Sequence, residues 1–168
     1  GIVFGTGIGG IETLLIQHSV LLEKGAGRVS PFMVPALMAN AAAGHLAMKF
    51  GLTGPNYCTV SACASSNHAI GEGMRLIRDG YLDVCISGGS EAATLPLTVA
   101  AFAQMTALTK NPDPDSASRP FDKNRNGFVL SEGAAAMILE SEEHARARGA
   151  RIYCEVAGYG MSDDAHHI

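Results

Sequence analysis

The chain has 168 residues, of which 47% are hydrophobic and 17% charged, and its formal net charge is −4 at pH 7. This balance supplies a large apolar core and excludes an intrinsically disordered chain. The negative charge offers no general attraction to nucleic-acid phosphates or anionic lipid, and no run of 18 apolar residues predicts a membrane span. We therefore expect one globular domain that binds neither nucleic acid nor membrane.

The four cysteines, at positions 58, 63, 85 and 154, form no CxxC pair and follow no regular spacing. Such a pattern predicts neither a zinc site nor a disulfide framework. We expect reduced thiols and a cytoplasmic protein.

Residues 1–4 (GIVF) predict a strand, and residues 5–10 (GTGIGG) follow it as a glycine-rich turn before a helix that ends at residues 24–25. The turn has the form GxGxxG. A dinucleotide site would also need a parallel strand soon after the helix and an acidic residue about 20 positions past the loop. Because a loop over residues 25–31 comes instead, we interpret the turn as structural.

The next elements alternate between helix and strand. Expected helices cover residues 36–50, 96–106 and 142–148, with another that follows Cys63 and stops at residues 79–80. Expected strands cover residues 57–61, 84–87, 134–140 and 152–159, and Gly88-Gly89 is expected to turn the chain. This alternation predicts an α/β layered fold.

Cys63 stands where a strand-like run gives way to a helical pattern. Such a turn lifts one side chain clear of the sheet and directs the free backbone N–H groups of the new helix toward it. A helix N-terminus favours a thiolate over a thiol, and the same N–H groups can receive a developing oxyanion. The residues alone also allow the plainer interpretation, since free cysteine is commonly a small buried apolar residue.

Two stretches imitate metal sites. Residues 122–127 (DKNRNG) match positions 1, 3, 5 and 6 of an EF-hand loop, but position 12 is Gly133 instead of a bidentate glutamate. The adjacent His166 and His167 do not face one ligand position, so the stretch 163–167 is interpreted as a solvated turn. We therefore expect no metal and no cofactor.

Three stretches carry a family resemblance: residues 61–71 (SACASSNHAIG), 83–92 (DVCISGGSEA) and 118–122 (SRPFD). They resemble the β-ketoacyl-acyl-carrier-protein synthases, and most closely the elongating synthase II type, from end to end of the chain. The resemblance implies a thiolase-like layered αβαβα fold, with residues 1–168 as a partial ketosynthase N-terminal domain. Because the chain opens inside an apparent strand without a start methionine and stops without a terminal element, we expect both ends to be truncated.

The resemblance implies an acyltransferase that performs decarboxylative Claisen condensation in fatty-acid or polyketide chain elongation. An acyl chain would move from acyl carrier protein onto Cys63 as a thioester, and a malonyl-carrier thioester would then lose carbon dioxide and attack it. The family's two catalytic histidines in His-Gly contexts and its catalytic lysine have no counterpart in this chain and would lie beyond Ile168. The chain alone is therefore expected to be inactive.

The resemblance also implies where substrate and partners bind. Ile8 and Phe102 would border the acyl chain, and Met33 would close the acyl pocket of the partner subunit in a homodimer. The carrier protein, which brings the acyl and malonyl groups, is acidic, and Arg28 is the best match to a basic residue that steers it.

Three alternatives stay open. A thiolase or an initiating synthase also uses a cysteine at a buried helix start, but residues 88–92 and 119–122 favour the elongating type. A non-catalytic chain-length factor resembles a synthase and lacks the cysteine, so Cys63 argues against it. The most distant alternative is a nucleotide-binding domain built on residues 5–10.

Overall fold

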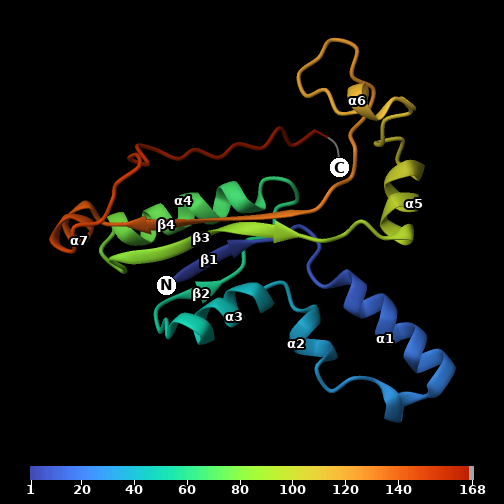
Figure 1. Ribbon diagram of the computed structural model, residues 1–168, viewed down its shortest axis with the longest axis horizontal. Coiled ribbons are helices and arrows are strands. Elements are labelled where there is room, and N and C mark those ends of the chain that lie inside the picture. The colour runs from blue at the N-terminus through green and yellow to red at the C-terminus, as the bar shows by residue number, and fades with distance from the viewer. Residues whose placement is uncertain (167–168) are drawn as a thin grey trace. The chain divides into compact units, whose positions relative to one another are not determined.

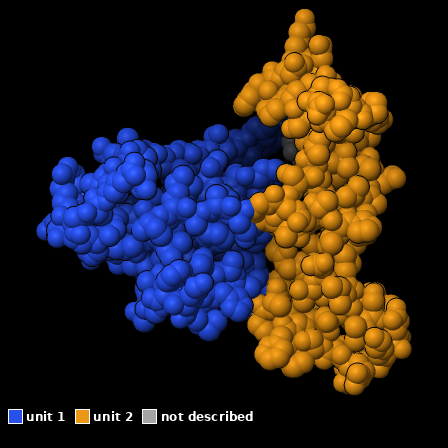
Figure 2. Space-filling view, in the orientation of Figure 1, with its two compact units in different colours: residues 1–7, 38–90, 134–168 blue, residues 8–37, 91–133 orange. Residues whose placement is uncertain are grey.

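The computed structural model describes residues 1–166 and divides into two compact units. Unit 1 contains Gly1–Gly7, Met38–Ser90 and the chain from Ala134 onward, and unit 2 contains Ile8–Leu37 and Glu91–Gly133 (Figure 2). Within the described residues, no helix combines the length and the apolar character that crossing a bilayer requires. His167 lies outside the described residues.

Unit 1 is built around a four-stranded sheet with the strand order β2-β1-β3-β4. The strands are β1 (Ile2–Gly5), β2 (Asn56–Tyr57), β3 (Val84–Glu91) and β4 (Gly133–Glu140). β1 pairs in parallel with both β2 and β3, so that Ile2 lies opposite Asn56 on one side and Ile86 on the other. β4 runs opposite to β3 (Figure 1). The sheet is therefore mixed, with an antiparallel strand at one edge.

Alternate residues of β1 enter two different cores, because successive side chains of a strand point to opposite faces of the sheet. The first core, against α3 (Ala41–Phe50), contains Ile2, Phe4, Ala43 and Ile86. The second core, against α4 (Ser65–Arg78), contains Val3, Ala69, Cys85 and Leu139. A helix thus covers each face of the sheet (Figure 1), and the α/β layered fold predicted from the sequence is confirmed.

The expected turn at Gly88-Gly89 is wrong, because both glycines lie inside β3. A Cβ atom on Gly88 would lie 2.9 Å from the Cα of Ala136 in β4, and one on Gly89 would lie 2.6 Å from the carbonyl oxygen of Gly5. Glycine in a strand commonly marks such a close approach of another backbone. The pair therefore allows the backbones of β1 and β4 to approach β3 closely, although two adjacent glycines usually indicate a turn.

The single helix expected over residues 36–50 is two helices, α2 (Met33–Leu37) and α3. At the end of α2, within unit 2, the carbonyl of Leu37 accepts a hydrogen bond from the N–H of Gly10 at 3.2 Å. The chain then restarts with the N–H of Ala41 donating to Met38 O at 2.9 Å.

The strand expected over residues 152–159 is also wrong. No strand is assigned in the described residues after β4, and Figure 1 shows this red segment running unpaired. A strand needs a neighbour to satisfy its backbone groups, and periodicity in one segment does not reveal whether a neighbour is present.

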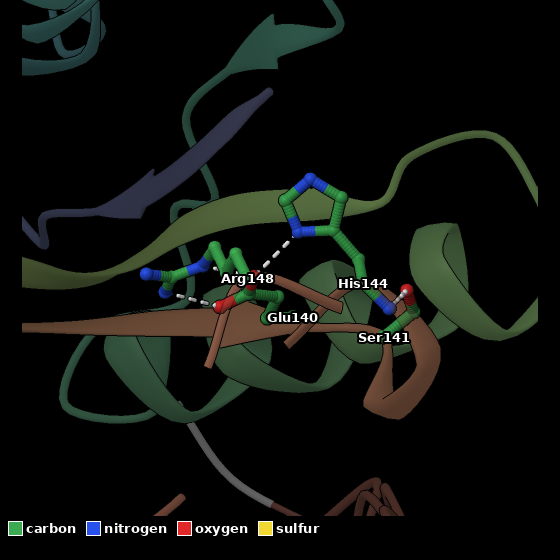
Figure 3. Close-up of polar contacts among 4 residues, drawn as sticks. All are labelled: Glu140, Ser141, His144 and Arg148. Carbon is green, nitrogen blue, oxygen red and sulfur yellow. Dashed lines mark hydrogen bonds and ion pairs between the residues drawn. The ribbon is translucent and has the colours of Figure 1, made fainter. Parts of the chain in front are cut away.

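Helix α7 (Glu142–Ala147) is held against the end of β4, as Figure 3 shows. Ser141 caps the helix, since its Oγ accepts the N–H of His144 at 3.3 Å. The carboxylate of Glu140 contacts both His144 and Arg148. Gly149, with φ of 68°, ends the helix where the sequence predicted.

Unit 2 is mainly helical. Its helices are α1 (Ile11–Lys24), the short 3-10 helix η1 (Ala26–Arg28), α2, α5 (Pro96–Gln104) and α6 (Pro114–Ala117). Gly25, with φ of 78°, ends α1, and Pro96 opens α5, where its missing N–H is not needed. These positions agree with the sequence-based boundaries to within two residues.

Candidate active site

Cys63 lies on the turn between β2 and α4, with an exposed side chain. The strand predicted over residues 57–61 is shorter than expected, since β2 ends at Tyr57. The segment still accompanies β1 to its end, because the N–H of Thr6 donates to the carbonyl of Thr59 at 3.3 Å. With α4 beginning at Ser65, the structure puts Cys63 at the strand-to-helix position that the sequence predicted.

The turn around Cys63 contains a residue in the left-handed region, Ala62 with φ of 50°. An L-residue with a side chain is disfavoured there by about 1–2 kcal/mol. Such a conformation persists only where the surrounding structure over-determines it, and it is found most often at functional sites. The strained residue here directly precedes the candidate nucleophile.

The backbone N–H groups of the turn are partly used already. The N–H of Ala64 donates to Ser61 O at 3.1 Å, and the N–H of Ser65 donates to Ala62 O at 3.2 Å. The sequence suggested that any of the first N–H groups of α4 could receive an oxyanion. These two bonds reduce the set, since a donor engaged in the turn is not free to bind a substrate oxygen.

His68, in the first turns of α4, is tied to the same region. Its Nδ1 lies 2.5 Å from Ser61 Oγ, and its ring meets that of Tyr159 edge-on with centroids 6.2 Å apart. These contacts give His68 a structural role in the turn. A cavity of about 450 Å³ adjoins it, lined by Ala64, Asn67, His68, Ile70, Gly71 and residues 156–162 apart from Ala157.

Tyr159 packs its ring on the bare backbone of Gly71, where a Cβ atom would overlap the ring. Its hydroxyl is buried and has no hydrogen-bond partner among the described residues. Burial raises the pKa of Tyr159, and the nearby carboxylate of Glu72 raises it further. Tyr159 therefore presents a neutral hydroxyl.

The three residues expected at the acyl chain all lie in unit 2. Ile8 follows β1 and is 42% exposed, Met33 is the first residue of α2, and Phe102 lies in α5. Phe102 packs edge-on against Phe128 with centroids 5.3 Å apart. Neither of the two cavities found around α4 and β2 is lined by any of the three, so their role at an acyl chain stays a prediction.

The glycine-rich turn over residues 5–10 is poorly suited to a phosphate. The N–H of Ile8 donates to Glu91 Oε2 at 3.0 Å. A carboxylate at the N–H group where a nucleotide phosphate would bind repels that phosphate. In the sequence around it, α1 leads to η1, α2 and α3 before the next strand. The dinucleotide alternative therefore loses its geometric support.

Among the described residues, no group of three or more His, Cys, Asp or Glu side chains is arranged to hold a metal ion. Glu132, one place before position 12 of the EF-hand-like stretch, instead accepts the N–H of Thr94 at 2.9 Å. Asp122 accepts the N–H of Asn124 at 2.6 Å in a local turn.

The site combines a mixed sheet that has a helix on each face with an exposed thiol at a strand-to-helix turn. Comparisons with known proteins identify the family that has this arrangement. Residues 1–145 match the family model for the β-ketoacyl synthase N-terminal domain, and the chain belongs to this family.

Two curated relatives that match the whole chain share one name. The chain is 53% identical over 169 residues to 3-oxoacyl-[acyl-carrier-protein] synthase 2 of Synechocystis sp. and 49% identical to that of Vibrio cholerae, with all of this chain covered in both. Among solved structures, it matches a chain of the AntDE:AntF complex, described as a type II PKS acyl-carrier protein in complex with its ketosynthase bound to the hexaketide. The TM-score is 0.91 and the sequence identity 32%, and the match covers 99% of this chain and 43% of that chain. The thiolase-like layered fold predicted from the sequence is thereby confirmed. The chain spans 41% of the length of these two curated relatives.

Sequence reasoning missed the residues that support Cys63. Ser65, Thr59 and Gly5 all contact the turn, and none was singled out as a candidate. The available signal was a serine in the first turn of a helix, where hydroxyls commonly bond to nearby backbone. Its partners, however, are known only from the folded turn.

Proposed function

We propose that the protein carrying this chain is a β-ketoacyl-acyl-carrier-protein synthase of the elongating type, with Cys63 as its nucleophile. The observation that carries the proposal is an exposed thiol at the N-terminal turn of α4 in a chain that belongs to the ketosynthase family. The other cysteines fit the role less well. Cys85 is fully buried, Cys58 directly follows β2 and lies farther from α4 along the chain than Cys63, and no helix follows Cys154 among the described residues.

The chemistry needs two steps. In the first, the Cys63 thiolate attacks the carbonyl of the acyl-carrier thioester, the new carbon–sulfur bond replaces the carrier's bond, and the carrier leaves as a thiol. In the second, malonyl-carrier thioester loses carbon dioxide, and its enolate carbon attacks the Cys63 thioester and releases the thiolate. The product is a β-ketoacyl-carrier thioester that is two carbons longer.

Each step develops negative charge on a thioester oxygen, which requires positioned hydrogen-bond donors. Because Ala64 and Ser65 use their N–H groups inside the turn, we assign the N–H of Cys63 itself as the donor that this chain contributes in the first step. The enolate of the second step needs further donors. The family resemblance assigns these to two histidines and a lysine beyond Ile168.

The substrate and partner assignments belong to the same proposal. Ile8 and Phe102 would limit the acyl chain, and Met33 would close the pocket of a partner subunit in a cytoplasmic homodimer. Acyl carrier protein is the expected substrate carrier, and an acyl-carrier protein is also present in the similar AntDE:AntF complex. Arg28, exposed at the end of η1, is available to attract an acidic carrier.

Acylation in the complete protein tests the proposal. Wild-type protein is incubated with an acyl-carrier thioester, digested and mapped by mass spectrometry, beside Cys63→Ala and a Cys154→Ala control that removes another exposed thiol. We expect the acyl mass on the Cys63 peptide in wild type and in the control, and none in Cys63→Ala. Acyl transfer that persists in Cys63→Ala would refute the assignment.

A further inference from the structure

Ser65 is hydrogen-bonded to three residues of the segment that precedes Cys63: Thr59, Ser61 and Ala62. It is the first residue of α4 and is 3% exposed. Its Oγ accepts the N–H of Ser61 at 2.9 Å and donates to the carbonyl of Ala62 at 2.7 Å. Its own carbonyl accepts the hydroxyl of Thr59 at 2.8 Å. A buried hydroxyl that both donates and accepts holds its partners in one arrangement.

Ser65 donates two hydrogen bonds to one carbonyl. The oxygen of Ala62 accepts both the Oγ–H and the N–H of Ser65, at 2.7 and 3.2 Å. This carbonyl belongs to the planar peptide unit that also contains the N–H of Cys63. In a trans peptide the C=O and the N–H point in opposite directions, so fixing the oxygen of Ala62 also fixes the direction of the Cys63 N–H.

The same bonds offset the strain of the turn. Ala62 is held at φ of 50°, in a region from which an L-residue would relax if it were released. The two hydrogen bonds from Ser65 to the carbonyl oxygen of Ala62 provide the restraint. Without the hydroxyl of Ser65 only the N–H contact at 3.2 Å would remain, and the peptide between Ala62 and Cys63 could rotate.

The sheet supports Ser65 from the other side. A Cβ atom on Gly5, the last residue of β1, would lie 2.5 Å from both the carbonyl carbon and the carbonyl oxygen of Ser65. The end of β1 therefore abuts the first residue of α4. This contact fixes the backbone of Ser65, while its hydroxyl bonds fix the turn relative to that backbone.

We infer that Ser65 is a positioning residue that aims the backbone N–H of Cys63 at the developing oxyanion of the acyl thioester. The inference rests on the proposed function of Cys63. Ser65 acts only through the Ala62–Cys63 peptide, and it touches no substrate. The consequence is specific, since acyl transfer requires the aimed N–H whereas simple alkylation of the thiol does not.

The test compares wild type with Ser65→Ala, Ser65→Thr and Ser66→Ala in the complete purified protein. Ser66→Ala is the matched control, because it removes the neighbouring hydroxyl, which lies against Gly89. Two reactions of Cys63 are measured. The first is acyl transfer from octanoyl-carrier thioester, described by kcat and KM, and the second is the rate of alkylation by iodoacetamide. Alkylation of the fully buried Cys85, followed in the same digests, reports unfolding.

In Ser65→Ala we expect kcat for acyl transfer to fall about 10- to 100-fold with KM little changed, because a misaimed oxyanion donor affects the transition state. In the same variant, the rate of alkylation of Cys63 should change by less than about threefold, and Cys85 should stay unlabelled. Ser65→Thr should restore acyl transfer. Ser66→Ala should match wild type in both rates.

An equal fall in both rates accompanied by labelling of Cys85 would overturn the inference, since Ser65 would then be a structural residue only. Wild-type acyl transfer in Ser65→Ala would overturn it as well. A wild-type protein that is never acylated at Cys63 would instead refute the proposed function, and with it the reaction that Ser65 is inferred to serve.

Discussion

The guanidinium of Arg148 forms a two-pronged ion pair with the carboxylate of Glu140, with Nε 2.6 Å from Oε1 and Nη2 2.7 Å from Oε2. The Glu140 side chain is only 9% exposed, and His144 lies 2.5 Å from the same Oε1. The hydrogen bonds from Arg148 first and His144 second lower the pKa of Glu140 from 4.5 to about 2. The pair thereby ties α7 and the residue that follows it to the end of β4 (Figure 3).

This geometry predicts an acid-sensitive contribution to stability. Because the pKa of Glu140 is lower in the folded state, its contribution is fully present above pH 4.5 and is lost as pH falls from 4.5 toward 2. Urea midpoints of wild type and Glu140→Gln, measured from pH 7 down to pH 3, should differ most at pH 7 and converge in acid. Glu142→Gln removes the exposed pair with Arg146 and should have little effect at any pH. A gap between wild type and Glu140→Gln that stays constant down to pH 3 would contradict the prediction.

The cysteines are expected to differ sharply in reactivity. With limiting iodoacetamide at neutral pH, Cys63 should be labelled first, since only it combines exposure with a helix N-terminus. Cys154 is also exposed, but it lies in the segment after α7 where no helix is assigned among the described residues. Peptide mapping therefore decides mainly between Cys63 and Cys154. Earlier labelling of Cys154 or Cys85 would count against an activated Cys63.

Two helical glycines should respond oppositely to alanine. A Cβ on Gly73 would overlap Ser87 Oγ and lie 3.1 Å from a methyl carbon of Leu139, so Gly73→Ala should destabilise by about 1–3 kcal/mol through overpacking of α4 on the sheet. Gly44, inside α3, has open space around it, and Gly44→Ala should stabilise by about 0.5–1 kcal/mol through helix propensity. Chemical denaturation of both variants measures the difference. Equal effects would show that the space around these helices is not what separates them.

Ile8→Phe in the complete protein should lower transfer of long acyl chains to Cys63 while acetyl transfer survives. The phenyl ring is larger than the isoleucine side chain and should leave room only for shorter acyl chains. Ile16→Phe, the same substitution at an exposed position of α1, serves as the control. Rates are compared for acetyl, octanoyl and palmitoyl thioesters. Equal loss for every length in Ile8→Phe would indicate misfolding and not a limit on chain length.

Residues 1–168 expressed alone should not condense substrates. They contain Cys63 and its turn, whereas the donors proposed for the enolate lie outside them. Exposed apolar side chains, among them Phe32, Met48 and Leu22 at 72–73% exposure, should also promote aggregation. Mass spectrometry of a mixture with acyl- and malonyl-carrier thioesters looks for a β-ketoacyl product. Product above the level of a Cys63→Ala variant would place the whole catalytic set within these residues.

The sequence alone determined the elements whose signals are local. The helix ends at Gly25, Gly80 and Gly149 follow from glycine's access to positive φ, and the buried strand at residues 2–5 follows from its apolar run. The place of Cys63 between a strand and a helix was also readable, because periodicity changes within a few residues there.

Only the tertiary structure decided the rest, because the relevant partners are distant in the sequence. Gly88-Gly89 continues a strand since β4 and β1 approach it closely, and the carbonyl at the end of α2 accepts the N–H of Gly10, which is distant in the sequence. Residues 152–159 have an apolar pattern but no strand beside them to pair with among the described residues. The role inferred for Ser65 also depends on the tertiary structure. Its hydroxyl bonds to the carbonyl of Ala62 only when the turn folds back onto α4, and the end of β1 supports its backbone.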